Sequence, residues 1–260
     1  MRCMDLYLAS GKRNQIRFAL ILQGGHLGSR SEWEKTTALL SELMSKDTYQ
    51  RVLGNRPLLF LFSIEDAVKF FESEEACNKA LRQLRQAVQK RSQADPYIAG
   101  MVFEPEKGLK FLSSLGLDAV SAYSNPPYGF SRKEFPYEHQ MQLNYSFWVE
   151  CKRLGVPLIP TVNTGWDFRP EADPSIPYRN PEADWIAQAT PQQIAAHLES
   201  AVTWVKTNPE ICVANAILIY AWNELNEGGW LLPTLKEGDA RLVEIRKVLR
   251  EEEKGHQADQ

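Results

Sequence analysis

Two glutamates, Glu224 and Glu227, follow an apolar run near the end of the chain. The run Ala216–Ala221 is long enough for a strand buried on both faces, and it turns polar at Trp222 and Asn223. Cleavage of a glycosidic bond needs one carboxyl group that protonates the leaving oxygen and another group that stabilises the developing positive charge. The two acids therefore predict a carbohydrate-processing site at the carboxyl end of a strand.

The residues around the two acids suit a sugar ligand. Trp222 and Trp230 offer aromatic faces for the apolar faces of sugar rings, and the Asn223 amide suits their hydroxyl groups. Gly228 and Gly229 stand where a tight turn or a close approach of two backbones would need them. The alternative is that the acids are ordinary surface residues, or that one of them only complements a helix dipole.

The string AWNELNEGGWLLPT, residues 221–234, resembles the signature of the family 99-like glycoside hydrolases. That group includes endo-α-mannosidases and polysaccharide-locus proteins labelled WbsX-like glycosyltransferases. Its last barrel strand typically ends in WNEW-x-EG, followed by an acidic residue and a proline. Here Leu225 replaces the tryptophan after the first acid, and Leu232 replaces the acidic residue before the proline. The resemblance thus covers the acids and the scaffold better than the substrate contacts.

Composition narrows the class of protein. The chain has 260 residues, 43% of them hydrophobic, which suffices for one large domain with a sizeable core. The net charge of −3, without a block of like charge, gives no indication of nucleic acid binding. No apolar run reaches the roughly 18 residues of a membrane span, and the opening residues are too short and too polar for a secretory signal. We expect a cytoplasmic protein for the sequence as given, and an extracytoplasmic one if the native amino terminus is longer.

The sequence carries no motif of another catalytic or cofactor class. The cysteines are widely spaced, so neither a disulfide framework nor a zinc site is predicted, and Cys77 and Cys212 are expected in the core. Nothing resembles a metal cluster, a P-loop or a dinucleotide fingerprint, and no serine stands in a G-x-S-x-G elbow. We therefore expect no metal, no cofactor and no acyl transfer.

Strand-like and helix-like segments alternate along the chain. The helix from Ser31, with Ser31 as its cap, should turn Leu39, Leu40, Leu43 and Met44 inward. In the helical stretch 65–92, Lys79, Arg82, Arg85 and Lys90 should form a solvated face, and residues 170–189 should form a long irregular loop. The predicted strands are 16–23, 56–63, 96–104, 118–124, 156–165 and 216–221, and the remaining predicted helices are 107–115, 137–154, 191–206 and 239–250.

This alternation predicts an α/β fold with a parallel sheet covered by helices, either an open doubly wound sheet or a (β/α)8 barrel. The resemblance implies the barrel, with 16–23 as the third of its eight strands. We therefore expect one partial TIM-barrel domain over residues 1–260, with six parallel strands and without the first two βα units. Strands 16–23 and 216–221 would then flank a gap, bridged by loops, open to solvent, or covered by a partner chain in a homo-oligomer.

The carboxyl ends of barrel strands are where chemistry is expected. Around VNTGWDFRP, residues 162–170, the sequence resembles the family's stretch after strand seven, where a Trp-Asp pair precedes an arginine. Asp167 would bind a hydroxyl or orient a neighbour, unless Arg169 simply pairs with it. A lone histidine beside two glycines, such as His26, is more often structural. The candidate substrate contacts at strand ends, besides Trp222, Asn223 and Trp230, are His26, Glu104, Tyr123, Asn163, Trp166 and Asp167.

Three functions remain open at this level. In the first, a retaining glycoside hydrolase, the resemblance implies that Glu224 assists the substrate's own 2-hydroxyl as nucleophile through a 1,2-anhydro-sugar, while Glu227 is the general acid and base. The second is a transferase in polysaccharide assembly, which would need a nucleotide-sugar site, although no D-x-D motif is found. The third is a non-catalytic glycan-binding or scaffold protein. A carbohydrate is the expected partner in all three.

Overall fold

The protein is described by a computed structural model that covers residues 2–127, 129–175 and 180–258. Its residue contacts divide the chain into two compact units. The first comprises Met1–Ser121 with Val213–Asn215, and the second comprises Ala122–Cys212 with Ala216–Gln260. The expectation of a single domain stays a prediction.

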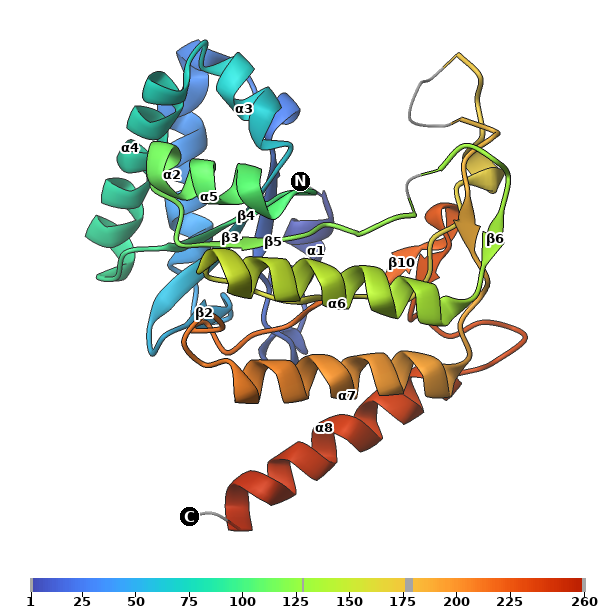
Figure 1. Cartoon of the computed structure of the whole chain (residues 1–260). Helices are drawn as coiled ribbons and strands as arrows, with labels where there is room; N and C mark the ends of the chain where they lie inside the picture. The colour runs from blue at the N-terminus through green and yellow to red at the C-terminus, as the bar shows by residue number, and fades with distance from the viewer. Residues whose placement is uncertain (1, 128, 176–179, 259–260) are drawn as a thin grey trace. The chain divides into compact units, whose positions relative to one another are not determined.

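The first unit is built on a parallel sheet with the strand order β1-β3-β4-β5. Helix α4 packs against both α2 and α5, in the blue-to-green part of Figure 1. The strands are β1 (Leu20–Gln23), β3 (Arg56–Phe62), β4 (Tyr97–Met101) and β5 (Ala119–Ser121), with β2 (Arg51–Val52) antiparallel to β3. The helices are α1 (Arg2–Ala9), α2 (Trp33–Met44), α3 (Ile64–Phe70), α4 (Glu74–Ser92) and α5 (Pro105–Leu115), with 3-10 turns η1 (Arg13–Gln15), η2 (Gly24–His26) and η3 (Arg30–Glu32).

The core of this unit follows the predicted periodicity. All five residues of β4 are buried. On α4, the stripe Cys77, Leu81, Leu84 and Val88 is buried as the helical spacing predicts. Strand β1 is different, since it lies at the edge of the sheet and its Ile21 is 47% exposed. The strand predicted at residues 16–23 is therefore only partly buried.

Three local predictions in the first unit need correction. The stretch 65–92 is two helices, because Glu72 has a positive φ of 72° and Ser73 starts a new helix by accepting a hydrogen bond from the Ala76 amide. Ser31 does not cap α2, because it lies inside η3. Leu39 is 41% exposed, whereas Leu40, Leu43 and Met44 are buried as expected.

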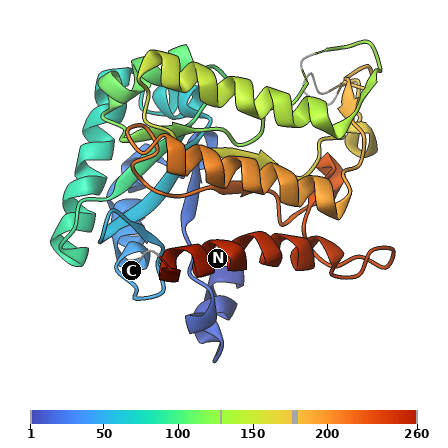
Figure 2. The same ribbon diagram turned by 60° about the horizontal axis from the view of Figure 1, so that its bottom comes forward.

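The described residues of the second unit form three long helices and three short pairs of strands. Helices α7 and α8 pack against each other, and Figure 2 shows them side by side. The helices are α6 (Tyr137–Leu154), α7 (Pro191–Thr207) and α8 (Ala240–Ala258), with 3-10 turns η4 (Arg169–Glu171) and η6 (Leu225–Glu227). The strands are β6 (Glu134–Phe135) beside β8 (Trp185–Ile186), β7 (Thr161–Asn163) beside β9 (Leu218–Tyr220), and the hairpin β10 (Asn223–Glu224) with β11 (Gly229–Trp230).

Helix α7 shows why the helices of this unit form where they do. Thr190 and Gln193 close a reciprocal capping box at its start, and Pro191 occupies the first turn. Its stripe Ile194, Leu198, Ala201 and Val205 is buried as predicted. Helix α6 likewise has the predicted bounds and ends at Gly155, whose φ of 67° suits glycine.

The six predicted strands correspond to β1, β3, β4, β5, β7 and β9, and each pairs in parallel with a neighbour. Strand β9 is shorter than predicted, and residues 216–219 are only half-buried, so it is not buried on both faces. Residues 170–189 are not wholly irregular, because β8 pairs with β6; residues 176–179 lie outside the described residues. The prediction that the strands at 16–23 and 216–221 flank a gap stays a prediction.

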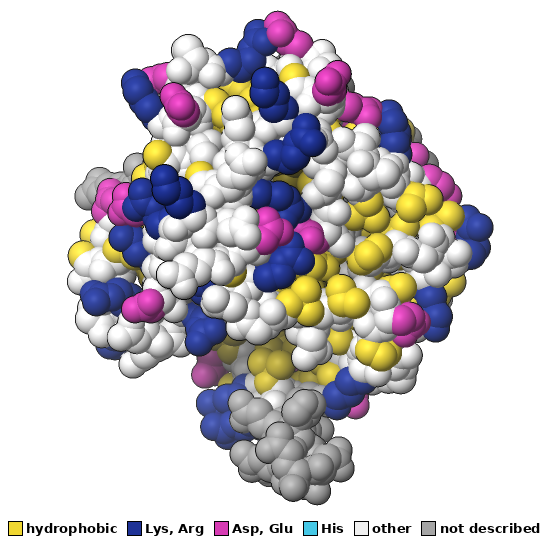
Figure 3. Space-filling view, turned by 90° about the vertical axis from the view of Figure 1, so that its left-hand side faces the viewer, with side chains coloured by type: hydrophobic (Ala, Val, Ile, Leu, Met, Phe, Trp, Pro, Cys, Tyr) yellow, Lys and Arg dark blue, Asp and Glu magenta, His cyan; other side chains and the backbone are white. Residues whose placement is uncertain are grey.

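The surface of the described residues carries both signs of charge. On the face drawn in Figure 3, basic and acidic side chains lie among each other. Within the described ranges, each helix is too short or too polar to cross a lipid bilayer.

Candidate active site

The loops that follow β7 and β9 are joined by backbone hydrogen bonds. The Thr164 amide donates to the Tyr220 carbonyl at 2.6 Å, and the Ala221 amide donates to Thr164 Oγ1 at 3.2 Å. Further along both loops, the Asp167 amide donates to the Glu227 carbonyl at 2.7 Å. The end of β7 therefore fixes the segment that carries the two acids.

Gly165 and Gly228 make this close contact possible, and Gly229 makes room for the Tyr220 ring. A Cβ on Gly165 would lie 2.1 Å from the Gly228 carbonyl oxygen, and one on Gly228 would lie 2.6 Å from the Asp167 nitrogen. Gly228 also has a φ of 78°, which glycine adopts without steric cost. A Cβ on Gly229 would lie 2.6 Å from the Tyr220 ring. The glycines after Glu227 thus serve the close approach that the sequence indicated.

Each of the two acids accepts a hydrogen bond from a tyrosine. The Tyr220 hydroxyl donates to Glu227 Oε2, and the Tyr123 hydroxyl donates to Glu224 Oε1 at 3.5 Å. The two tyrosine rings meet edge to face, with centroids 5.0 Å apart. Glu224 and Glu227 therefore belong to one cluster of polar and aromatic side chains.

The electrostatics of this cluster keep both tyrosines protonated. Burial raises the pKa of Tyr220, and its hydrogen bond to Glu227 raises it further. Burial also raises the pKa of Tyr123, assisted by the charges of Glu227 and Glu224. Both phenols are therefore permanent hydrogen-bond donors to the acids at physiological pH.

Trp166 joins the same cluster, while Asp167 is engaged elsewhere. The Trp166 ring is buried, with its centroid 5.8 Å from that of Tyr220. Asp167 accepts two hydrogen bonds from the Arg169 guanidinium, at 2.9 and 2.8 Å, and one from the Arg169 amide at 3.0 Å. That guanidinium also lies 3.8 Å from the ring centre of Trp185. Asp167 is thus paired with Arg169, which was the alternative interpretation of this motif.

Asn163 lies behind the cluster rather than at a surface. It is fully buried; its Oδ1 accepts a hydrogen bond from Asn144 Nδ2 at 3.0 Å, and its carbonyl accepts one from the Tyr137 hydroxyl. That hydroxyl also lies 3.0 Å from His197 Nδ1. The structure therefore places Asn163 in a buried polar network that supports the end of β7.

The acid-bearing hairpin exposes two candidate sugar contacts and covers a third. Trp222 is 55% exposed, and Asn223 is exposed beside it. Trp230 pairs with Asn223 across the hairpin, but the Arg241 guanidinium lies 4.2 Å from its ring centre. A sugar ring would therefore find Trp222 accessible, whereas one face of Trp230 is taken by Arg241.

His26 and Glu104 belong to the first unit. His26 is exposed at the end of η2, which follows β1. Glu104 precedes α5 and pairs with Lys107 at 2.8 Å, both side chains being more than half exposed. Both residues therefore belong to a different unit from the cluster around the two acids.

Sequence reasoning missed Tyr220 and the network behind β7. Tyr220 was counted as part of an apolar run. A hydroxyl group at the last position of a strand nevertheless indicates a candidate site residue, because chemistry is expected at the carboxyl ends of barrel strands. On α6, Tyr137, Gln140 and Asn144 are buried at helical spacing with Phe147 and Trp148. Polar residues within an inward-facing stripe could have indicated a buried hydrogen-bonded network.

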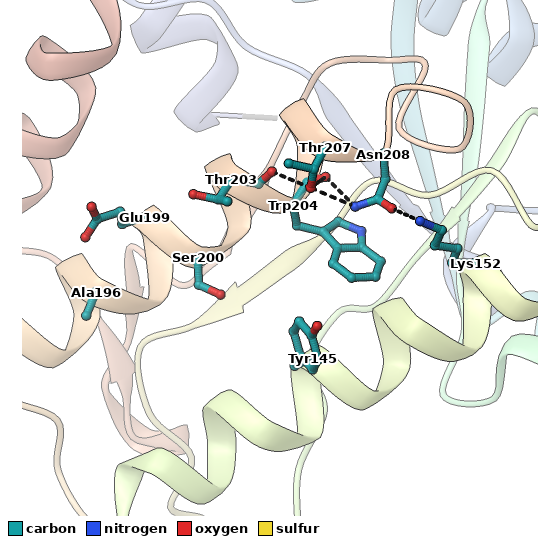
Figure 4. Close-up of a pocket in the computed structure, with 9 residues that line it drawn as sticks. All are labelled: Tyr145, Lys152, Ala196, Glu199, Ser200, Thr203, Trp204, Thr207 and Asn208. Carbon is teal, nitrogen blue, oxygen red and sulfur yellow. Dashed lines mark hydrogen bonds between the residues drawn. The ribbon is translucent and has the colours of Figure 1, made fainter.

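A hollow in the second unit is lined by residues outside this cluster. It measures about 600 Å³ and is lined by residues of α6 and α7 (Figure 4). Its polar groups bond to one another, since Lys152 donates to Asn208 and Asn208 donates to the Trp204 carbonyl at 2.8 Å. Among the residues that line it, the one acid is Glu199. Among the described residues, no group of three or more His, Cys, Asp or Glu side chains is arranged to hold a metal ion.

Two solved structures that are similar to the chain have related folds at low sequence identity. The GH99 endo-α-mannosidase from Bacteroides thetaiotaomicron matches with a TM-score of 0.60 and 15% identity over 96% of this chain and 70% of that one. Its complex with bis-tris-propane matches with a TM-score of 0.56 and 14% identity over 93% of this chain and 71% of that one. The fold is accordingly of the (β/α)8-barrel type, as predicted.

At the level of sequence, a search of curated proteins finds no significant match. The family model described as Glycosyltransferase WbsX matches residues 12–245, which include both acids and both loops of the site. The family expected from the string at residues 221–234 is thereby confirmed. The chain belongs to the WbsX glycosyltransferase family.

Proposed function

We propose that this protein is a glycoside hydrolase-like enzyme that cleaves a glycan with retention of anomeric configuration, using Glu224 and Glu227. The observation that carries the proposal is the cluster at the end of β9, where each of the two acids accepts a hydrogen bond from a tyrosine, Tyr220 being buried and Tyr123 half-buried. Retaining cleavage needs two carboxyl groups with different tasks. Tyrosine partners suit those tasks because they orient a carboxyl group without adding a formal charge.

In the proposed first step, Glu224 removes the proton from the substrate's 2-hydroxyl, and the resulting oxygen attacks the anomeric carbon. The glycosidic bond breaks as Glu227 gives its proton to the departing oxygen, which leaves a 1,2-anhydro-sugar. In the second step, Glu227 takes a proton from water, and the hydroxide oxygen opens the three-membered ring at the anomeric carbon. Glu224 then returns its proton to the 2-oxygen, so that both acids regain their starting states.

The nature of the substrate is proposed from the neighbours. The similar solved structures are described as endo-α-mannosidases. An α-linked, mannose-containing oligosaccharide is therefore the first substrate to test. The exposed Trp222 and Asn223 at the hairpin are the side chains proposed to meet its sugar rings.

The test compares Glu227→Gln and Glu224→Gln with the wild type on substrates that have poor and activated leaving groups. Glu227→Gln should lower turnover of poor leaving groups by about 10²–10⁴-fold, the usual contribution of acid–base assistance, and affect activated ones less. Glu224→Gln should impair both kinds, because it acts where the anhydro ring forms. Glu199→Gln, on α7, is the matched control and should leave rates unchanged. Equal activity of the wild type and the double variant would contradict the proposal.

A transferase is the second candidate, because the matching family carries that description. The same two acids could pass the sugar to an acceptor hydroxyl in place of water. Product analysis with and without an added sugar acceptor separates the two. A new glycosidic product favours the transferase, and only shortened glycan favours the hydrolase. Binding without any cleavage would favour a glycan-binding relative.

A further inference from the structure

We propose that Tyr220 is the positioning residue of Glu227, which fixes the carboxyl group in place and determines which of its oxygens exchanges the proton. The inference rests on the proposed function and deepens it, because it assigns a role within that site to a residue outside the family-like string. The Tyr220 hydroxyl donates to Glu227 Oε2. An oxygen that accepts this hydrogen bond is a poor place for the acidic proton, which is therefore assigned to Oε1.

Tyr220 can fix Glu227 only if the tyrosine itself is fixed, and three neighbours hold its ring. It is 3% exposed at the last position of β9. Its ring lies edge to face with Tyr123 and tilted by 43° against Trp166, with centroids 5.0 and 5.8 Å away. Gly229 lies so close that a Cβ there would be 2.6 Å from the ring. The hydroxyl therefore has little freedom to leave Glu227.

The hydrogen bond also acts on the protonation of Glu227. A donor directed at a carboxylate favours its ionised form, which is the form needed to take a proton from water in the second step. Burial and the negative charge of Glu227 raise the pKa of Tyr220, so the phenol does not itself release a proton. Tyr220 is thus a fixed donor rather than an acid in the reaction.

Other titratable groups adjoin this pair and bear on its pH dependence. The charge of Glu224 raises the pKa of Tyr220 together with that of Glu227, and the neutral Tyr123 lies edge to face with the Tyr220 ring. Asp167 lies next to Glu227, because its amide donates to the Glu227 carbonyl. The Asp167 carboxylate is itself paired with Arg169. On η6, Asn226 beside Glu227 donates to Glu171. All of these remain in place in a Tyr220→Phe variant, so a change in its pH profile reports the lost hydroxyl.

The decisive experiment is the pH profile of kcat/KM for Tyr220→Phe, with Tyr123→Phe as the matched control that removes the hydroxyl facing Glu224. Without the donor, the ionised form of Glu227 is less favoured, so the general acid stays protonated to higher pH. The alkaline limb should move upward by about one pH unit, the size of one hydrogen bond to a charged group. The rate at the optimum should fall about tenfold on poor leaving groups and less on activated ones. Tyr123→Phe should leave the alkaline limb in place.

A second variant keeps the test valid if Tyr220→Phe folds poorly. Replacing Tyr220 with 3-fluorotyrosine keeps the ring and strengthens the donor, so the alkaline limb should move to lower pH. An unmoved limb in either folded variant, with Glu227→Gln inactive, overturns the role of Tyr220 and leaves the proposed function intact. Full activity of Glu227→Gln would instead remove the proposed function, and this inference with it.

Discussion

Carboxylates gather in two regions of the molecule, and their partners differ in kind. In the first unit, Asp95 and Asp118 are each bonded to Arg56 and Arg85, at 2.6–2.9 Å. In the second unit, Glu224 and Glu227 each accept from a tyrosine. A guanidinium is always charged and holds its carboxylate in the ionised form. A phenol, by contrast, adds no formal charge to the carboxyl group that it orients.

The positions of these groups along the strands explain the division. Asp95 and Asp118 precede β4 and β5, and Arg56 begins β3, so the ionic network lies at the amino ends of parallel strands. The tyrosine-bonded acids follow the carboxyl end of β9. In barrel folds the amino ends of the strands serve stability and the carboxyl ends serve chemistry. A variant in the ionic network should therefore change stability, whereas a variant of the tyrosine-bonded acids should change activity and leave stability nearly unchanged.

The largest effect on stability is expected from Asp118→Ala. It would leave Arg56 and Arg85 without one carboxylate each, and the Ile98 amide without its acceptor. Breaking a buried pair typically costs about 3–5 kcal/mol, and partial exposure of this one places the expected loss near 3 kcal/mol. Urea denaturation measures it, with Lys79→Ala on the exposed face of α4 as the control. A loss no greater than that of the control would show that the network is not stabilising.

An intermediate effect should appear when the pH is lowered. Burial lowers the pKa of His197 to about 4, from an ordinary 6.5, against a backbone hydrogen bond to Asn163 that raises it. Between these values the unfolded chain binds a proton that the folded chain does not, so stability falls as the pH drops below 6.5. The expected loss is about 2 kcal/mol by pH 4.5. Denaturation midpoints across this pH range measure how stability depends on pH. The variant His197→Gln should weaken this dependence, and an unchanged dependence would contradict the role of His197.

The smallest effect on stability is expected from Glu227→Gln, the variant with a large expected effect on activity. The glutamine amide oxygen can still accept the Tyr220 hydrogen bond, so the free energy of unfolding should change by less than about 1 kcal/mol. Urea denaturation beside Asp118→Ala gives the comparison directly. A loss as large as that of Asp118→Ala would mean that the acid is part of the architecture, and the contrast between the regions would fail.

Local patterns predicted much of the fold and the acids of the site. The six strands and the stripe of α7 followed from periodicity, because burial repeats at fixed spacing along each element. Glycine marked the end of α6. The sequence signal for the helix break at Ser73 was also local. Because apolar spacing continues on both sides of Ser73, it was not recognised as a capping residue. Strand β8 was missed because two residues beside a proline-rich segment carry no periodicity.

What could not be predicted depends on contacts between distant segments. Arg85 was expected on a solvated face of α4, yet it bonds to Asp95 and Asp118. Asp167 and Arg169 matched a motif, and only the structure shows them bonded to each other. The tyrosines that bond the two acids come from different segments, so no spacing within the string at 221–234 could indicate them.

Gly165 and Gly228, which join the loops after β7 and β9, also bear on how the site can be redesigned. Because a Cβ on either would meet backbone atoms of the opposite loop, the two loops should be transplanted together when specificity is exchanged between homologues. A mutant library should keep those glycine codons fixed. Diversity belongs at Trp222, Asn223 and Leu225, whose exposed side chains can change without disturbing the hairpin that holds the acids.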